Sequence, residues 1–152
     1  MTVFYYSLRF FHIMSAAIWF GAVLLTPGDV RQTLELGRPH AEGLKDRLEK
    51  SVGISLRAGV LTVITGFTLI MTSGGFSQVP LRINIGMGLA LLMLALGFGI
   101  IAPLSNAICD LIASKNGDLE AAKSYAPKLG MVSGINHLLW FITLGLMVFK
   151  NL

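Results

Sequence analysis

The sequence has little charge and almost no cysteine. Only 13% of its 152 residues are charged, whereas 54% are hydrophobic, and the mean hydropathy is +0.72. This balance excludes an ordinary water-soluble domain and is typical of an integral membrane protein. The single cysteine, Cys109, rules out an intramolecular disulfide framework and a thiolate cluster for zinc or iron–sulfur ligation. We expect it to fill apolar space near a helix end.

Several functional motifs are also missing from the sequence, and acidic residues are missing from its long apolar runs. The sequence contains no phosphate-binding loop, dinucleotide fingerprint, His-Glu-x-x-His or nucleophile elbow, which argues against soluble-enzyme chemistry. All eight acidic residues lie outside the long apolar runs, which argues against an ion-driven carrier with buried carboxylates. Because the basic residues alternate with acids in the connections, the net charge of +4 does not indicate nucleic-acid binding.

Four long apolar runs are present, at about 4–27, 53–73, 83–104 and 130–149. A bilayer core about 30 Å thick is crossed by about 20 apolar helical residues. The sequence therefore predicts an all-α integral membrane protein, in which residues 1–152 form a single antiparallel bundle of four transmembrane helices. The first run has no basic region well ahead of it, so we expect it to remain in the mature protein rather than act as a cleavable signal.

The polar connection 29–50 is too hydrophilic to enter lipid, and Gly37 with Pro39 divides it into two short helical pieces. In the second piece Leu44 and Leu48 are four residues apart, with charged residues between them. This pattern predicts a short amphipathic helix that lies at the cytoplasmic surface or caps the bundle.

The connection before the last run predicts a turn at Asn116–Gly117 and a short helix from Asp118, with Pro127 marking entry to the last span.

The basic residues are distributed unevenly between the two sides of the predicted membrane. Nine fall in or beside the 28–52 and 105–129 connections, and three, Arg9, Arg82 and Lys150, fall on the side of the two termini. Because Lys and Arg in short loops stay in the cytoplasm, we expect a multi-pass protein of a bacterial inner membrane with both termini on the outer, periplasmic side.

Two histidines lie within the apolar runs, each with a tryptophan on the same helical face. His12 is followed by Trp19 seven residues later, with Ser15 and Ala16 between them, and His137 is followed by Trp140. Ionisable residues in a membrane span indicate a functional or pairing role. Imidazole in a dry bundle is a good ligand for haem iron, although such a face can also serve only close helix packing.

These positions predict a haem site with His12 and His137 as axial iron ligands and Trp19 and Trp140 beside the macrocycle. Arg57 would pair with a haem propionate, with Arg9 or Arg82 as partners at the outer end. The two histidines differ in depth by about 10 Å, so we expect two haems, or one haem on His12, rather than one shared haem. The candidate sixth ligands in the outer half are Met71, Met87 and Met147.

The spacing of His12, Trp19 and Gly21, H-x6-W-x-G, resembles that of the copper-resistance D-type membrane proteins and of the HemJ-type protoporphyrinogen oxidases, four-span families. The resemblance implies haem b bound through His12. It does not supply a reaction, because the lysine and histidine of the HemJ-type third span are absent from 83–104, which offers only Asn84.

We therefore predict a membrane-embedded b-type cytochrome that holds one or two haems and passes electrons from a lipid-phase donor, such as quinol, to an acceptor on the outer face. A HemJ-like porphyrinogen oxidase is one alternative. A non-redox accessory subunit or a copper-import module is another, since methionine and histidine also suit copper. Gly-x-Gly pairs at 86–88 and 97–99 allow close contact within one chain, in a homo-oligomer or in a larger membrane complex.

Overall fold

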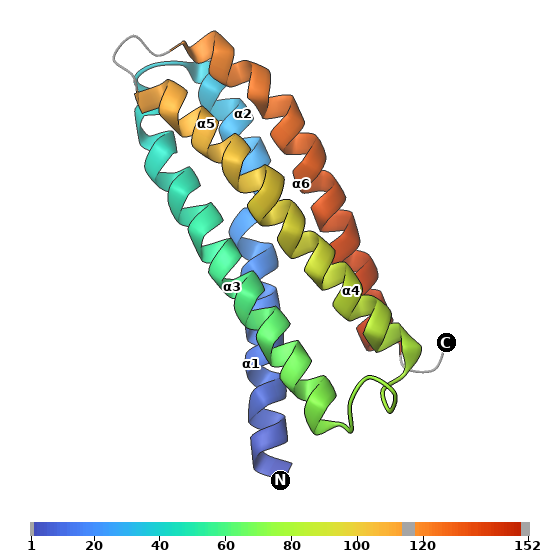
Figure 1. Cartoon of the computed structure of the whole chain (residues 1–152). Helices are drawn as coiled ribbons and strands as arrows, with labels where there is room; N and C mark the ends of the chain where they lie inside the picture. The colour runs from blue at the N-terminus through green and yellow to red at the C-terminus, as the bar shows by residue number, and fades with distance from the viewer. Residues whose placement is uncertain (1, 114–117, 150–152) are drawn as a thin grey trace.

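The computed structural model describes residues 2–113 and 118–149, which form four long helical segments (Figure 1). The segments contain 34, 33, 33 and 30 residues, and each is long and apolar enough to cross a membrane. At 1.5 Å per residue the shortest is about 45 Å long, which exceeds the hydrocarbon thickness of about 30 Å. The predicted all-α bundle of four transmembrane helices is confirmed, and its helices are long enough to extend past the lipid core.

The first segment comprises α1 (Thr2–Leu24) and α2 (Thr26–Leu36). Pro27 lies in the first turn of α2, where its missing N–H costs no helical hydrogen bond. The end of α2 is set by Gly37, whose φ of +71° favours glycine over residues with a side chain. The division of the polar connection at this glycine agrees with the sequence prediction.

The second segment corrects the prediction of a separate short amphipathic helix, at the cytoplasmic surface or capping the bundle, before the second span. After a short 3-10 turn, η1 (His40–Gly43), a single helix α3 runs from Leu44 to Thr72 without a break. Leu44 and Leu48 are almost completely buried in the main hydrophobic core. Their apolar face therefore packs inside the bundle as the first turns of the spanning helix, rather than on a membrane surface.

The third segment comprises α4 (Leu81–Leu96), one π-helical turn η2 (Gly97–Ile101) and α5 (Ala102–Ala113). Pro103 is the second residue of α5 and lacks the N–H that an α-helix would pair with the carbonyl of Gly99, which lies in the π turn. A wider turn at this position accommodates the missing bond. The segment ends nine residues later than the predicted span, which places Cys109 in the core as a small apolar residue.

The fourth segment is α6 (Leu119–Val148). Asp118 caps it, because its carboxylate accepts a hydrogen bond of 3.0 Å from the backbone N–H of Ala121. The helix continues through Pro127, which therefore lies inside the segment rather than at the start of the span. The turn predicted at Asn116–Gly117 lies outside the described residues.

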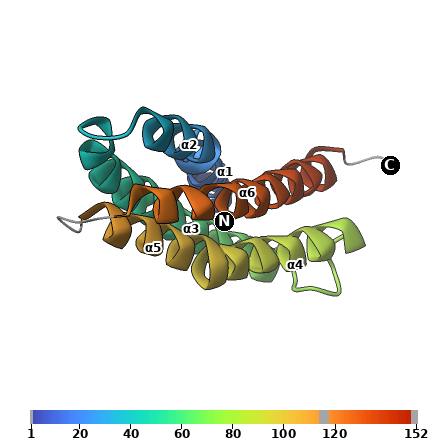
Figure 2. The same ribbon diagram turned by 90° about the horizontal axis from the view of Figure 1, so that it is seen from above.

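The bundle has two differently packed halves. We call the end at which both termini lie the termini end, and the opposite end, which carries α2, the α2 end (Figure 1). Helix α1 packs along α3, and α4 packs along α6; the two pairs separate towards the termini end (Figures 1 and 2). The main core cluster fills the α2 half and consists of Val30, Leu34, Ala41, Leu44, Leu48, Val52, Ile101, Leu104, Ile108, Cys109, Ile112, Ala122, Ala126, Leu129 and Val132.

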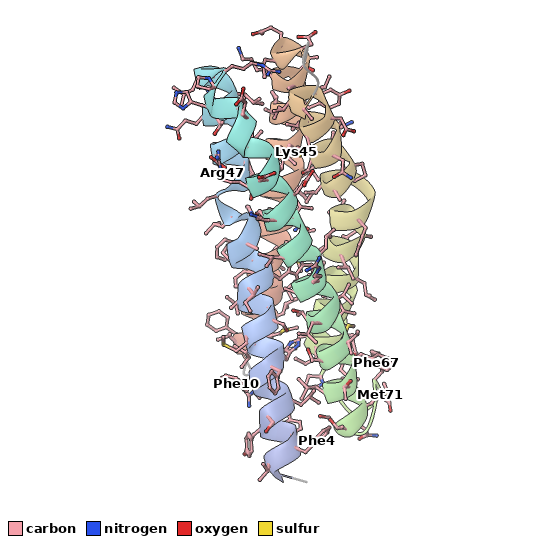
Figure 3. The ribbon with its side chains drawn as sticks, turned by 90° about the vertical axis from the view of Figure 1, so that its left-hand side faces the viewer. Phe4, Phe10, Lys45, Arg47, Phe67 and Met71 are labelled. Atoms are coloured by element: carbon pink, nitrogen blue, oxygen red, sulfur yellow. The ribbon has the colours of Figure 1, made fainter. Side chains whose placement is uncertain are left out.

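The outer surface changes in character between the two ends. Phe4, Phe10, Phe67 and Met71 are exposed around the termini end, as expected for side chains in contact with lipid (Figure 3). Towards the α2 end the surface carries charges, among them an ion pair of 3.0 Å between Arg47 of α3 and Asp29 of α2. The charged end of the bundle is therefore the part that extends into water.

Candidate functional site

A cavity of about 630 Å³ lies between the two helix pairs in the termini half of the bundle. Its volume is within the range of about 300 to 1,000 Å³ that is usual for small-molecule and cofactor sites. The walls are mainly apolar, and the deep end is formed by Trp19, Trp140 and Met93. Arg9, Arg82 and Gln78 line it as well, and the first two come from near the ends of α1 and α4 that lie at the termini end.

His12 lines this cavity, and its ring is fixed by α3. Its Nδ1 lies 3.0 Å from the carbonyl oxygen of Thr62 and 3.1 Å from the hydroxyl oxygen of Thr65. The Thr62 carbonyl can only accept a hydrogen bond. The Thr65 hydroxyl donates its one proton to the carbonyl of Leu61, at 2.7 Å, so towards His12 it can also only accept. Nδ1 therefore carries the proton, and Nε2 keeps its lone pair.

Two glycines of α3 leave room for the two aromatic residues of α1. A Cβ at Gly66 would lie 3.0 Å from Cε1 of His12, and a Cβ at Gly59 would lie 2.8 Å from Cε2 of Trp19. The seven-residue interval of His12 and Trp19 is thus matched by a seven-residue interval of glycines on the antiparallel helix. Close contact between α1 and α3 requires both glycines.

Hydroxyl groups continue this contact along the two helices. Thr62 donates to the Ser15 hydroxyl at 3.0 Å, Ser55 donates to the carbonyl of Trp19 at 3.3 Å, and Ser51 donates to the carbonyl of Ala22. In a membrane, where helices gain little from hydrophobic association, small residues and such hydrogen bonds hold helices together. The wall that carries His12 is therefore well supported.

The rim of the cavity at the termini end is cationic. Nε of Arg82 is buried and has no hydrogen-bond partner among the described residues, and Arg82 and Arg9 line the cavity from α4 and α1. The adjacent connection is held by Asn84, whose amide donates to the carbonyl of Phe76 at 2.9 Å. An anionic group at this rim would meet two guanidinium groups.

The structure brings together three of the five predicted site residues. His12, Trp19 and Trp140 all line the cavity. Trp140 is stacked on Phe20 of α1, with ring centroids 4.2 Å apart and an angle of 22° between the planes. This stack joins α1 to α6 at the deep end.

The other two predicted residues, His137 and Arg57, do not line the cavity. The His137 ring meets the Phe20 ring edge to face at 5.4 Å. Phe20 is eight residues from His12, or about 12 Å along the helix, so the predicted difference in depth is present. The Nε2 atom of His137 is buried without a partner among the described residues. Arg57 is exposed on the outside of α3.

Of the three methionines predicted as sixth ligands, two line the cavity and one does not. Met87 and Met147 line the cavity together with Met93, whereas Met71 is exposed outside it. A Cβ at Gly66 would also lie 3.2 Å from Cε of Met87, so this thioether is close to the His12 ring. The cavity therefore offers one imidazole and several thioethers.

Sequence reasoning missed the residues of α3 that hold the His12 ring, Thr62 and Thr65. A signal for Thr62 was present, because positions 51, 55, 59, 62 and 66 carry only serine, threonine or glycine at helical spacing. Such a stripe marks the side of a membrane helix that approaches a neighbour. It would have identified the face of α3 opposite His12.

Comparison of the chain with protein-family models, with curated proteins and with solved structures found no match.

Proposed function

We propose that this protein is a b-type haem protein of the membrane, with one haem held by His12 in the termini half of the bundle. The observation that carries the proposal is the position of the His12 ring: its Nδ1 lies 3.0 Å from the Thr62 carbonyl and 3.1 Å from the Thr65 hydroxyl, beside a cavity of about 630 Å³. These contacts leave Nε2 as an electron-pair donor. Ligating histidines usually donate their second ring nitrogen to a carbonyl or carboxylate in this way.

The remaining residues of the cavity fit the same group. Its apolar walls suit a macrocycle, and Trp19 and Trp140 provide flat surfaces at the deep end. Arg82, whose buried Nε has no hydrogen-bond partner within residues 2–113 and 118–149, and Arg9 suit the two propionates. Haem iron would supply one-electron transfer, while the protein binds and orients the group and excludes water from it.

We propose a single haem rather than two. The second predicted ligand, His137, lies beside Phe20 and outside the cavity. The excess of basic residues near the α2 end favours a bacterial inner membrane with the termini end on the outer side. Electrons would then pass from a lipid-phase donor such as quinol to an acceptor at the outer face.

The test is haem content by pyridine haemochrome analysis and a reduced-minus-oxidised spectrum, after expression with sufficient haem. We expect one haem b per chain in the wild type, loss of haem in His12→Ala and retention in His137→Ala. A colourless wild-type protein, or a His12→Ala variant with full haem content, would contradict the proposal.

A copper-binding function is the second candidate, and one observation favours it. Met87, Met93 and Met147 line the same cavity as His12, and thioether and imidazole ligands suit copper(I). Metal analysis of the purified protein separates the two candidates. Stoichiometric copper without a haem spectrum would favour copper, and loss of that copper in a Met87→Leu variant would locate it in the cavity.

A further inference from the structure

The His12 ring rests on three groups of α3: the carbonyl of Thr62, the hydroxyl of Thr65 and the α-carbon of Gly66. Only the Thr65 hydroxyl can be removed by a substitution that leaves the backbone and the volume nearly unchanged. It is buried, and its proton is engaged within α3, so towards His12 it acts as an acceptor. The threonine thus has a defined role beyond filling space.

We propose that Thr65 is a positioning residue of the proposed haem site. Its hydroxyl is the second acceptor for the Nδ1–H of His12. Together with the Thr62 carbonyl it fixes the ring so that Nε2 faces the cavity, and it lowers the reduction potential of the iron bound there. The statement about iron rests on the proposed haem function. The statement about the ring does not.

The effect on the iron follows from the electron density of the imidazole. A neutral imidazole whose Nδ1–H donates to two acceptors, as in His12, carries more negative charge on Nε2 than one with a single acceptor. A more basic axial ligand stabilises ferric over ferrous iron, which lowers the reduction potential. Removal of one acceptor should therefore raise the potential.

Three variants separate the hydrogen bond from side-chain volume. Thr65→Val keeps the shape and removes the acceptor, and Thr65→Ser keeps the acceptor and removes a methyl group. Thr68→Val is the matched control. The Thr68 hydroxyl donates to the carbonyl four residues earlier, that of Ile64 at 2.8 Å, as the Thr65 hydroxyl donates to the carbonyl of Leu61. Thr68, however, has no hydrogen bond to His12.

The first measurement is a redox titration of the haem-loaded variants. We expect Thr65→Val to reduce the preference for ferric iron by about threefold to tenfold, the equivalent of one hydrogen bond, which is an upward shift of about 28 to 59 mV. Thr65→Ser and Thr68→Val should keep the wild-type potential. An unchanged Thr65→Val potential, or equal shifts in Thr65→Val and Thr65→Ser, would overturn the proposed role.

The second measurement is nitrogen NMR of the His12 ring in the haem-free protein, labelled at histidine. We expect a protonated Nδ1 in the wild type, in Thr65→Ser and in Thr65→Val, because the Thr62 carbonyl remains as an acceptor. In Thr65→Val alone the Nδ1 chemical shift should change, because one of its two acceptors is lost, and an unchanged shift would overturn the proposed role. An unprotonated Nδ1 in the wild type would overturn the proposal. If the wild type binds no haem, the proposed function fails, and this measurement still decides the role of Thr65.

Discussion

The two halves of the bundle differ in what fills the space between the helices. In the α2 half, Leu34, Leu44 and Ile108 are completely buried in one continuous core. In the termini half, the two helix pairs enclose a cavity, and the small cluster formed by Trp19, Ala58, Ala90 and Met93 lies at its deep end. The α2 half resembles the core of a soluble protein, whereas the termini half keeps room for a ligand.

This difference in packing indicates which interactions stabilise each half of the bundle. The α2 end carries the charges, and there the burial of leucine and isoleucine is driven by exclusion from water. In the lipid-embedded termini half, helices gain little from hydrophobic association and depend on small residues and hydroxyl groups. A well-packed half thus supports a half that is less filled, in which a binding cavity can exist.

The largest expected effect tests this division of stability. Leu44→Ala should lower the free energy of unfolding by about 2 to 5 kcal/mol, because it leaves a cavity in a packed core. Met147→Ala, at the wall of an existing cavity, should cost less than about 1 kcal/mol. Reversible unfolding in mixed micelles measures both values. Equal losses would show that the two halves contribute alike.

The next effect concerns the contact between α1 and α3. Gly59→Ala should destabilise the protein by about 1 to 3 kcal/mol, because the new Cβ would lie 2.8 Å from the Trp19 ring. Gly53→Ala is the control on the same helix, because its Cβ would meet nothing within 4 Å, and it should be neutral or stabilising. The same unfolding experiment compares them. A tolerated Gly59→Ala would mean that the two helices separate easily.

A smaller effect is expected at the rim of the cavity. Arg82→Gln should weaken binding of the proposed haem about tenfold, as expected for loss of a charge-assisted hydrogen bond to a propionate. Arg57→Gln should change the affinity less than about twofold, because Arg57 is exposed outside the cavity. Competition for haem with a soluble haem-binding protein measures the affinities. The reverse order would restore Arg57 as the propionate partner.

The smallest effect is expected at the water-exposed surface of the α2 end. Asp29→Asn removes the ion pair with Arg47 and should cost about 0.2 to 1 kcal/mol at low salt, since both side chains are about half exposed to water. The difference from wild type should shrink as salt is added. Unfolding at two salt concentrations measures it. A loss that is large and independent of salt would mean that Asp29 supports the fold in another way.

Much of this fold could be predicted from the sequence, because hydropathy and length determine the membrane-crossing segments. The continuity of α3 could not, since Leu44 and Leu48 have the spacing of any amphipathic helix and only tertiary packing shows what covers them. The extension of the third segment from residue 104 to Ala113 was also missed. Local signals for helix ends are weak where neighbouring helices can compensate for a missing bond.

The site could be predicted as far as helical faces allow. His12, Trp19 and Trp140 were identified from spacing, and the structure brings them to one cavity. His137 shares a face with Trp140 but lies deeper, beside Phe20. Arg57 lies on the exposed side of α3. Spacing tells which residues of a helix point the same way, but how far each helix is rotated and shifted depends on contacts with the others.

The paired seven-residue intervals on α1 and α3 restrict the insertions and deletions that these two helices can tolerate. Deleting one residue between His12 and Trp19 would turn one ring by about 100° relative to the other, and only a matching deletion between Gly59 and Gly66 would realign the two helices. Relatives of this chain should therefore be recognisable by two linked signatures, H-x6-W in the first span and G-x6-G in the second, even where little else is alike.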